Sequence, residues 1–306
     1  SRLYRYRRES PPTKRTPVFF CMPLINRTYV IDLSPGNSLV EYLLQQGFDV
    51  FMYDWGVWGP EDRHVSLADL LTAYLPRAVR EASRVAGDPI TLLGYCIGGT
   101  LAAVFAALYP EAPLKNLVLF TAPIDFSEAG DFGKWVAKGK FPVEKIRDTL
   151  AAMPGELIDV GSKMLNPLGN TVGTYVRLWE KLGDPKFDPK GWQAMYRWVN
   201  EGTPFPATAY YEWITRFYQD NQLFREEFDV NGRKVKLSNI RLPILNVAAA
   251  ADTIAPRPTT NAILGMVSSQ DKEELLLQGG HVGIVVGRAA RHNLWPKVAG
   301  WLERHD

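Results

Sequence analysis

One short stretch constrains the fold of this chain more than any other. An apolar run at residues 90–93 ends at the pentapeptide Gly-Tyr-Cys-Ile-Gly, residues 94–98, and a second apolar segment, residues 100–109, follows. The pattern predicts a strand, a very tight turn and a helix, which together form a nucleophile elbow with cysteine in place of serine. Glycine is needed two residues before and two residues after the cysteine, because the backbones of the strand and the helix nearly touch there. We therefore expect Cys96 at the top of a sheet, at a helix N-terminus that favours a thiolate.

The two cysteines of the chain differ in their surroundings. Cys21 lies inside the apolar run of residues 18–22, and we expect it to be a packing residue, the commoner role of an isolated cysteine. Cys96 has flanking glycines and a strand-to-helix switch, so we expect it to be a nucleophile. Two cysteines do not indicate a disulfide scaffold, and a reducing compartment fits them.

Length and composition fit a large globular protein and disfavour several other classes. The 306 residues accommodate one α/β domain or a core with an inserted cap, and a hydrophobic content of 46% suffices for a sizeable core. The net charge of +2 gives no reason to expect nucleic acid as a partner. We expect no membrane span, because no apolar run reaches about 18 residues. Metal-ligand spacing, a phosphate-binding glycine loop and an opening dinucleotide fingerprint are missing from the sequence, so we expect no metal and no cofactor.

Apolar runs alternate with helical patterns over most of the chain, which predicts an α/β fold with a mostly parallel sheet and helices on both faces. Strands are expected at residues 18–22, 48–53, 90–93, 117–120, 243–248 and 274–277. Helices are expected at residues 38–46, 66–85, 100–109, 261–267 and 292–304. The core therefore comprises residues 17–123 and 241–306. Residues 1–16 are rich in arginine and are expected to form a basic, solvated leader without a partner.

The composition and the hydrophobic pattern of the sequence change between residues 124 and 240. Prolines, glycines and aromatic residues become frequent, the alternation is lost, and five of the nine tryptophans lie here. Segments 143–153 and 207–221 have helical patterns. We therefore expect a mainly helical cap inserted between two strands of the core. Its aromatic residues either line a substrate or dimer surface or pack the cap's own core, and both alternatives stay open.

Three residues that could act together each follow a predicted parallel strand. They are Cys96, Asp252 and His281. The ligand site of an open α/β sheet lies at the carboxyl ends of its strands, so these side chains are expected to converge. Their chain order, nucleophile then acid then histidine, is that of α/β-hydrolases. We expect Cys96 to be the nucleophile, His281 its base, and Asp252 the group that orients His281 and stabilises its charge.

Other candidates for these roles fit less well. Asp125 also follows a strand but begins the cap, and Asp54 comes too early in the chain order. His64 lies in a polar loop, whereas His292 and His305 lie near the end of the chain and are expected to be solvated. We therefore keep Asp252 and His281 as the partners of the cysteine.

An oxyanion hole for this nucleophile should come from two backbone amides. The elbow motif itself supplies the N–H of Ile97, which directly follows Cys96. The second N–H should come from the loop after the strand at residues 18–22, at Leu24 or at Ile25. Of these two neighbours we choose Ile25.

These residues and several flanking motifs resemble the catalytic part of bacterial polyhydroxyalkanoate (PHA) synthases. The matching pieces are Pro23-Leu24-Ile25-Asn26-Arg27, Asp32-Leu33, Asn37-Ser38-Leu39-Val40, Gly47-Phe48-Asp49-Val50, Asp54-Trp55-Gly56, residues 94–100, Ala251-Asp252-x-Ile254-x-Pro256 and Gly279-Gly280-His281-Val282-Gly283. The match runs from residue 17 to the end of the sequence. The short length is most similar to the two-subunit, class III-like synthases, whose catalytic subunit needs a second, non-catalytic subunit.

The resemblance implies a substrate that residue spacing does not indicate. This substrate is (R)-3-hydroxyacyl-coenzyme A, most simply 3-hydroxybutyryl-CoA. Cys96 would take the acyl group and release CoA, and a hydroxyl of the next unit or of the growing polyester would then attack the thioester. The resemblance leaves open whether Asp252 activates that hydroxyl or supports only His281. The alternative function is hydrolysis by a thioesterase or depolymerase with the same three residues, and the intact set argues against a non-catalytic scaffold.

The resemblance also implies the setting in which such an enzyme works. Coenzyme A is released as a product and is not a cofactor. The family resemblance further implies a homodimer through the cap and a location in the bacterial cytoplasm, at polyester storage granules. Trp198 matches a tryptophan that the family uses near its cap and dimer surface, so we expect it at that surface or along the substrate channel.

Overall fold

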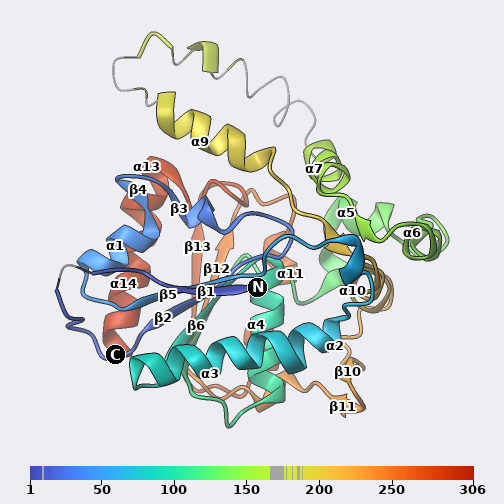
Figure 1. Cartoon of the computed structure of the whole chain (residues 1–306), viewed down its shortest axis with the longest axis horizontal. Helices are drawn as coiled ribbons and strands as arrows, with labels where there is room; N and C mark the ends of the chain where they lie inside the picture. The colour runs from blue at the N-terminus through green and yellow to red at the C-terminus, as the bar shows by residue number, and fades with distance from the viewer. Residues whose placement is uncertain (9, 166–175, 177, 181, 185–186, 188) are drawn as a thin grey trace.

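The computed structural model describes residues 1–8, 10–165, 176, 178–180, 182–184, 187 and 189–306. Its centre is a seven-stranded sheet with the strand order β1-β5-β2-β6-β7-β12-β13 (Figure 1). These strands are β1 (Arg2–Arg5), β2 (Val18–Cys21), β5 (Val50–Asp54), β6 (Ile90–Tyr95), β7 (Leu114–Phe120), β12 (Ile244–Ala249) and β13 (Lys272–Leu277). Neighbours from β5 to β13 run parallel, whereas β1 is antiparallel to β5. The predicted mostly parallel sheet is thus confirmed.

The inner strands are apolar because both faces of the sheet are covered. Every residue of β2, β6 and β12 is buried. The register places Cys21 beside both Tyr53 and Gly94, and it places Ala249 beside Leu277. The carboxyl ends of the parallel strands therefore lie along one edge of the sheet, where a ligand site is expected.

The helices of the core form close to their predicted positions. They are α1 (Leu39–Gln45), α2 (Leu67–Asp69), η3 (Leu70–Tyr74), α3 (Leu75–Ala86), α4 (Ile97–Leu108), α11 (Arg257–Asn261), α12 (Ile263–Met266), α13 (Gly287–Ala289), η8 (Ala290–Leu294) and α14 (Trp295–Arg304). The helix predicted at residues 66–85 consists of α2, the π-helical turn η3 and α3 in succession. It begins at a capping box, in which the Ser66 and Asp69 side chains each accept a hydrogen bond from the other residue's backbone N–H. Helix α4 is buried along its whole length against β6 and β7, which makes it a rigid platform for the elbow.

The segment between β7 and β12, for which we predict an inserted cap, carries short helices and two-residue strands. Its elements are η4 (Phe126–Glu128), α5 (Gly130–Trp135), α6 (Val143–Thr149), β8 (Ala152–Met153), α7 (Gly155–Met164), α9 (Pro189–Val199), β9 (Phe205–Pro206), α10 (Ala207–Glu212), η6 (Trp213–Gln219), β10 (Asp229–Val230), β11 (Arg233–Lys234) and η7 (Leu237–Asn239). The helix predicted at residues 143–153 ends at Thr149, because residues 152–153 form β8 and pair with β9. The limits of the cap at residues 124 and 240 stay a prediction.

Some aromatic residues of the cap pack its own core, and others lie on its surface. The Phe126 ring packs against the rings of Trp213, Phe217 and Tyr218, with centroids 5.6, 5.3 and 4.8 Å away. These side chains form a small core within the cap. In contrast, Trp135 is 40% exposed. Packing therefore explains the first group, and it leaves some of the tryptophans on the surface.

The N-terminal segment is not the separate leader that we expected, although most of its side chains are exposed. Residues 2–5 form β1, which pairs along β5 and extends the sheet by one strand. The Arg5 guanidinium forms an ion pair of 2.8 Å with the buried carboxylate of Asp49, and the Arg8 side chain donates a hydrogen bond to the Phe48 carbonyl. The expectation was wrong because an arginine-rich composition reports on solubility and not on backbone pairing.

A second expectation fails at the end of the chain. His305 is partly buried instead of solvated, and its ring stacks on that of Trp301 with centroids 4.0 Å apart. Its Nε2 lies 2.8 Å from a carboxylate oxygen of Asp271, and its Nδ1 lies 2.7 Å from the Trp301 carbonyl oxygen. His305 thus ties α14 to the loop before β13.

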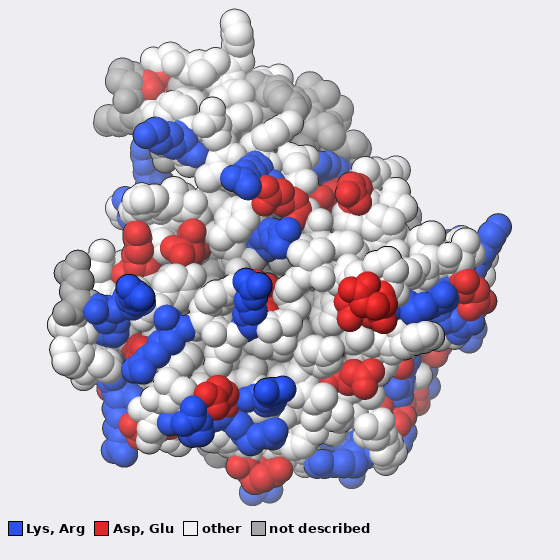
Figure 2. All heavy atoms as spheres, viewed as in Figure 1, with Lys and Arg blue, Asp and Glu red and all other residues white. Residues whose placement is uncertain are grey.

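The surface agrees with the expectations from charge and hydropathy. Figure 2 shows basic and acidic side chains interspersed over one face of the molecule. Such a mixed surface matches the small net charge of +2. Within the part of the chain that the structure describes, no helix combines the length and the apolar character needed to cross a bilayer.

Candidate active site

Cys96 stands in a strained turn between β6 and α4. Its backbone angles are φ 52° and ψ −125°, and a positive φ of this kind costs a residue other than glycine about 1–3 kcal/mol. The Cys96 N–H donates a hydrogen bond of 2.8 Å to the Phe120 carbonyl at the end of β7, which anchors the turn. A Cβ atom on Gly98 would lie 2.2 Å from the Cys21 carbonyl oxygen, so only glycine lets α4 approach β2 this closely. The elbow predicted from the pentapeptide is therefore present.

His281 and Asp252 meet beside the elbow. The Nδ1 atom of His281 lies 2.7 Å from Oδ2 of Asp252. The other carboxylate oxygen of Asp252 accepts hydrogen bonds from the backbone N–H groups of Ile254 and Ala255, at 2.8 and 2.9 Å. Asp252, His281 and Cys96 are 7, 9 and 9% exposed. The three residues predicted from separate strand ends therefore lie at one edge of the sheet, and each of them is largely buried.

The electrostatics of the site favour a charged histidine. Burial of the imidazole opposes its protonation, but the negative charges of Asp252 and Cys96, with hydrogen bonds to both, raise the pKa of His281 above its ordinary 6.5. An imidazolium next to a cysteine stabilises the thiolate. The arrangement is one that would suit a cysteine nucleophile whose histidine is oriented by a carboxylate.

Tyr95 is part of the site, although the sequence provided no reason to single it out. Its ring stacks on the His281 ring with centroids 5.4 Å apart and an interplanar angle of 30°. Its hydroxyl donates a hydrogen bond of 3.3 Å to the His281 carbonyl. Burial, with smaller effects of the charges of Cys96 and Asp252, raises the pKa of Tyr95 well above its ordinary value, so this hydroxyl stays a neutral donor.

The rival residues have other partners. The Asp125 carboxylate accepts hydrogen bonds from Ser127 and Asn221 in the cap, and the Asp54 carboxylate accepts one from the backbone N–H of Gly56. His64 and His292 are exposed. Of these candidates, the structure thus places only Asp252 and His281 together. Among the described residues no cluster of three or more His, Cys, Asp or Glu side chains could hold a metal ion.

The amides expected to form an oxyanion hole lie close to the elbow. Ile97 is the first residue of α4, where backbone N–H groups lack helical partners. Leu24 and Ile25 follow β2, whose last residue contacts Gly98 of the elbow. Among the described residues none of these three N–H groups donates a hydrogen bond within the protein. They are available to a ligand, and the choice of Ile25 over Leu24 stays a prediction.

The cap reaches the site through Tyr218 and reaches the neighbouring loop through Trp198. Burial raises the pKa of Tyr218, and the charges of Cys96 and Asp252 add to this effect, so its phenol lies within electrostatic reach of both. Trp198 is 5% exposed, and its Nε1–H donates a hydrogen bond of 2.7 Å to the Arg27 carbonyl. In this structure Trp198 is a buried contact between the cap and the loop at Arg27, and its expected place at a dimer surface or substrate channel stays untested.

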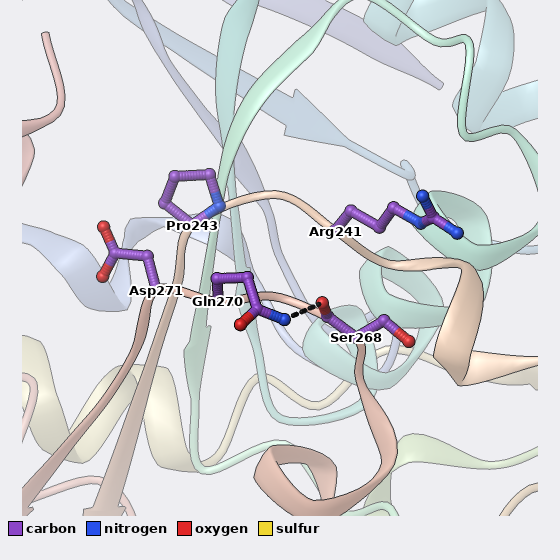
Figure 3. A pocket seen from close by; sticks show the side chains of 5 residues that line it. All are labelled: Arg241, Pro243, Ser268, Gln270 and Asp271. Atoms are coloured by element: carbon purple, nitrogen blue, oxygen red, sulfur yellow. Dashed lines mark hydrogen bonds between the residues drawn. The ribbon is translucent and has the colours of Figure 1, made fainter.

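A surface hollow at the opposite end of the sheet is a separate feature. It is lined by Arg241, Pro243, Ser268, Gln270 and Asp271, at the amino ends of β12 and β13 (Figure 3). The Gln270 side-chain amide donates a hydrogen bond of 3.3 Å to the Ser268 carbonyl. Because Cys96 lies at the carboxyl ends of the strands, this hollow has no part in the candidate active site.

Comparison with known structures agrees with the fold. The chain superposes on a monoacylglycerol lipase of Paleococcus ferrophilus with a TM-score of 0.62 and 16% identity over the full length of both chains. A lipase of Sulfolobus solfataricus, titled as putative, gives a TM-score of 0.62 with 14% identity over 99% of this chain and 94% of the other. These similarities concern the fold alone.

Comparison of sequences is more specific. A family model described as the alpha/beta hydrolase fold matches residues 31–287, and one described as the poly-beta-hydroxybutyrate polymerase (PhaC) N-terminus matches residues 1–43. Proteins named poly(3-hydroxyalkanoate) polymerase subunit PhaC are 33% identical in Haloferax mediterranei, over 98% of this chain, and 32% identical in Allochromatium vinosum, also over 98%. The chain spans 61% of the length of the first relative and 84% of the second. It therefore belongs to the α/β-hydrolase fold family and, within it, to the poly(3-hydroxyalkanoate) polymerase PhaC family.

Proposed function

We propose that this chain is the catalytic subunit of a polyester synthase. It would polymerise (R)-3-hydroxyacyl-CoA, most simply 3-hydroxybutyryl-CoA, and release CoA. The observation that carries the proposal is a cysteine elbow beside the paired His281 and Asp252 in a member of the PhaC family. Cysteine suits this chemistry, because transfer from CoA to a thiol replaces one thioester by another without a large thermodynamic step.

In the first half of the reaction the substrate's acyl group moves to the enzyme. The Cys96 thiolate attacks the thioester carbonyl carbon, and a new S–C bond forms as the bond to the CoA sulfur breaks. The His281 imidazolium gives its proton to the departing CoA thiolate. The N–H groups of Ile97 and Ile25 would hold the carbonyl oxygen while it carries negative charge.

In the second half the chain grows by one unit. The 3-hydroxyl of the next unit, or of the polymer end, gives its proton to neutral His281, and its oxygen attacks the carbonyl carbon on Cys96. An ester bond forms, and the Cys96 thiolate leaves beside a protonated His281. One oxygen of Asp252 faces His281 and the other accepts two backbone hydrogen bonds, which supports a role of Asp252 through His281 and not directly on the hydroxyl.

The names of the relatives support synthesis over the alternative of hydrolysis. Water competes with the polymer hydroxyl for the acyl group on Cys96, so a synthase must keep water out. The three side chains are each at most 9% exposed. The low exposure of these side chains agrees with that requirement.

The setting of the enzyme belongs to the same proposal. We expect a homodimer through the cap, a second, non-catalytic synthase subunit, and a location at polyester granules in the bacterial cytoplasm. The relatives named as PhaC subunits support the second subunit. Coenzyme A is expected only as a product, and no cofactor is needed for either half reaction.

One experiment tests the central proposal. The protein is incubated with 3-hydroxybutyryl-CoA, and both free thiol and polymer are followed over time. We expect CoA release with polymer growth, and loss of both in Cys96→Ala and His281→Ala. His292→Ala, which changes an exposed histidine, is the matched control and should behave as the unaltered protein. Release of free hydroxy acid without polymer would support the hydrolase and contradict the synthase.

A further inference from the structure

Thr203 of the cap donates hydrogen bonds to two successive carbonyl groups of the loop that follows β2. The Thr203 hydroxyl donates a hydrogen bond of 2.8 Å to the Leu24 carbonyl, and the Thr203 backbone N–H donates one of 2.8 Å to the Ile25 carbonyl. Thr203 is only 2% exposed. These bonds join segments that are far apart in the sequence, and nothing in the sequence pattern pointed to them.

The first of these bonds orients a particular amide. The Leu24 carbonyl and the Ile25 N–H belong to the same peptide unit, which is planar and trans, so the two groups point in opposite directions. Holding the Leu24 carbonyl toward the cap therefore directs the Ile25 N–H away from the cap residue and toward the other side of the loop. The second bond fixes the next peptide unit, so Ile25 is held from both sides.

The loop follows directly on the part of β2 that packs against the elbow. Its peptides directly follow Cys21, whose carbonyl oxygen is in tight contact with Gly98 of the elbow. The Ile25 N–H donates no hydrogen bond within the described residues, although its peptide is firmly held. Stabilisation of an oxyanion requires a rigid, unpaired amide. The Ile25 N–H meets this requirement, and its loop begins where β2 contacts the elbow.

We propose that Thr203 is a positioning residue of the oxyanion hole. Its hydrogen bond orients the Ile25 N–H toward the position of the substrate's carbonyl oxygen. This orientation holds only while the cap is packed against the loop. The inference rests on the proposed acyl transfer at Cys96, and it selects Ile25 over Leu24.

Neighbouring contacts also hold this part of the cap against the loop that follows β2. The Trp198 indole bonds to the Arg27 carbonyl, and the Glu201 carboxylate accepts a hydrogen bond of 2.8 Å from the Tyr29 hydroxyl. Helix α9 contacts η1 (Thr28–Ile31) and β3 (Asp32–Ser34), and it lies above β3 in Figure 1. A cap that moves away from this loop would release the Leu24 carbonyl and leave the Ile25 amide free to turn. Acylation would then be slow whenever the cap is not seated.

The test compares Thr203→Val with Thr208→Val. Thr208 has the same pair of contacts at another loop, because its hydroxyl and its N–H both donate to the Arg63 carbonyl, at 2.8 and 3.1 Å. Two rates are measured for each variant: the first release of CoA from 3-hydroxybutyryl-CoA, which needs an oxyanion hole, and alkylation of Cys96 by iodoacetamide, which does not. Loss of one oxyanion donor slows catalysis by about 100- to 1,000-fold, so a misdirected donor should cost about 10- to 100-fold.

We expect Thr203→Val to slow the first release of CoA by about 10- to 100-fold. The rate of Cys96 alkylation should change less than about threefold. Thr203→Ser should restore most of the rate, because it keeps the hydroxyl, and Thr208→Val should match the unaltered protein. Thr203→Ala serves as a second variant without the hydroxyl if valine prevents folding, which a thermal melt detects. Unchanged CoA release, or an equal loss of alkylation, would overturn the assignment. Absence of any CoA release from the unaltered protein would instead contradict the proposed synthase.

Discussion

The Tyr95 ring stacks on the His281 ring, and the Tyr95 hydroxyl donates a hydrogen bond to the His281 backbone carbonyl. Tyr95 immediately precedes Cys96 on β6, whereas His281 lies on the loop after β13. The two contacts therefore fix the loop that carries His281 to the strand that leads into Cys96. Asp252 holds one ring nitrogen of the same histidine, so its ring and backbone are both constrained.

Replacement of Tyr95 should separate these two contacts. Tyr95→Phe keeps the stacked ring and loses one hydrogen bond, so alkylation of Cys96 by iodoacetamide should slow by about threefold to tenfold. Tyr95→Leu also loses the stacking, which is worth about 0.5–1.5 kcal/mol, and should slow alkylation by a further factor of about three to ten. The control is Tyr53→Phe, a buried tyrosine whose ring packs on Phe19 and Trp55. A rate in Tyr95→Leu equal to that of the control would show that the stacking has no positioning role.

Asp252→Asn should lower the proton affinity of His281. The Asp252 carboxylate is one of the charges that raise the pKa of His281, and an amide lacks that charge. The pKa of His281 should therefore fall in the variant, and general catalysis by His281 should weaken by on the order of 100-fold. The pH profile of CoA release and the NMR titration of the imidazole measure the two effects. An unshifted titration would contradict the assigned ion pair.

The same pair gives a stability that depends on pH with a defined sign. The pKa of His281 is raised in the folded state, so the stabilisation is complete below the ordinary value of 6.5 and is lost as the pH rises through the raised value. His281→Gln should thus cost more unfolding free energy at pH 6 than at pH 10. Urea denaturation at the two pH values measures this difference, and Asp252→Asn should remove most of it.

Asp159→Asn should stabilise the protein at neutral pH. Burial raises the pKa of Asp159 to about 6, against an ordinary 3.8, although its carboxylate accepts a hydrogen bond from the Gly202 backbone N–H. A raised carboxyl pKa means that stability falls as the pH rises from 3.8 through 6, because the folded state binds the proton more tightly. We expect a gain of about 1 kcal/mol at pH 7.5, after allowance for solvent screening, and almost none at pH 3.5. Equal gains at both pH values would exclude ionisation as the cause.

Gly98→Ala should damage the elbow, whereas a similar change elsewhere should not. The new Cβ would lie 2.2 Å from the Cys21 carbonyl oxygen and 2.6 Å from the Met22 carbonyl oxygen, and both belong to the backbone. Overpacking of this kind costs about 1–3 kcal/mol, and it should displace the loop that carries Ile25. Gly300→Ala in α14 meets nothing within 4 Å and should be neutral or slightly stabilising. Melting temperatures and CoA release of both variants test the contrast.

The parts of the site that could be predicted from sequence are those that follow a local pattern. Cys96, Asp252 and His281 each stand at the end of an apolar run, and parallel strands bring such ends to one edge. The elbow required glycine for a steric reason that holds in any chain. For these residues the local pattern predicts that each stands at the end of a strand. The parallel topology of the sheet then brings the three strand ends together.

The parts that were missed depend on contacts between distant segments. Tyr95 looked like a filler between Gly94 and Cys96, and its role appears only when the loop after β13 is in place. Thr203 follows an irregular stretch of the cap, where no period links it to Leu24. His305 was expected in solvent because no sequence rule relates the last helix to the loop before β13. Such pairings are decided by tertiary packing and leave no local signal.

Strand β1 has a consequence for how copies of this protein meet. Without residues 2–5, β5 would present a bare row of N–H and C=O groups at the margin of an apolar sheet, which is a template for pairing with another chain. With them, β5 is covered by a strand of four residues, and the charge of Arg2 on this strand disfavours its pairing with another copy. A variant without residues 1–5 should therefore associate edge to edge as its concentration rises. We expect β1 to protect this margin of the sheet against aggregation.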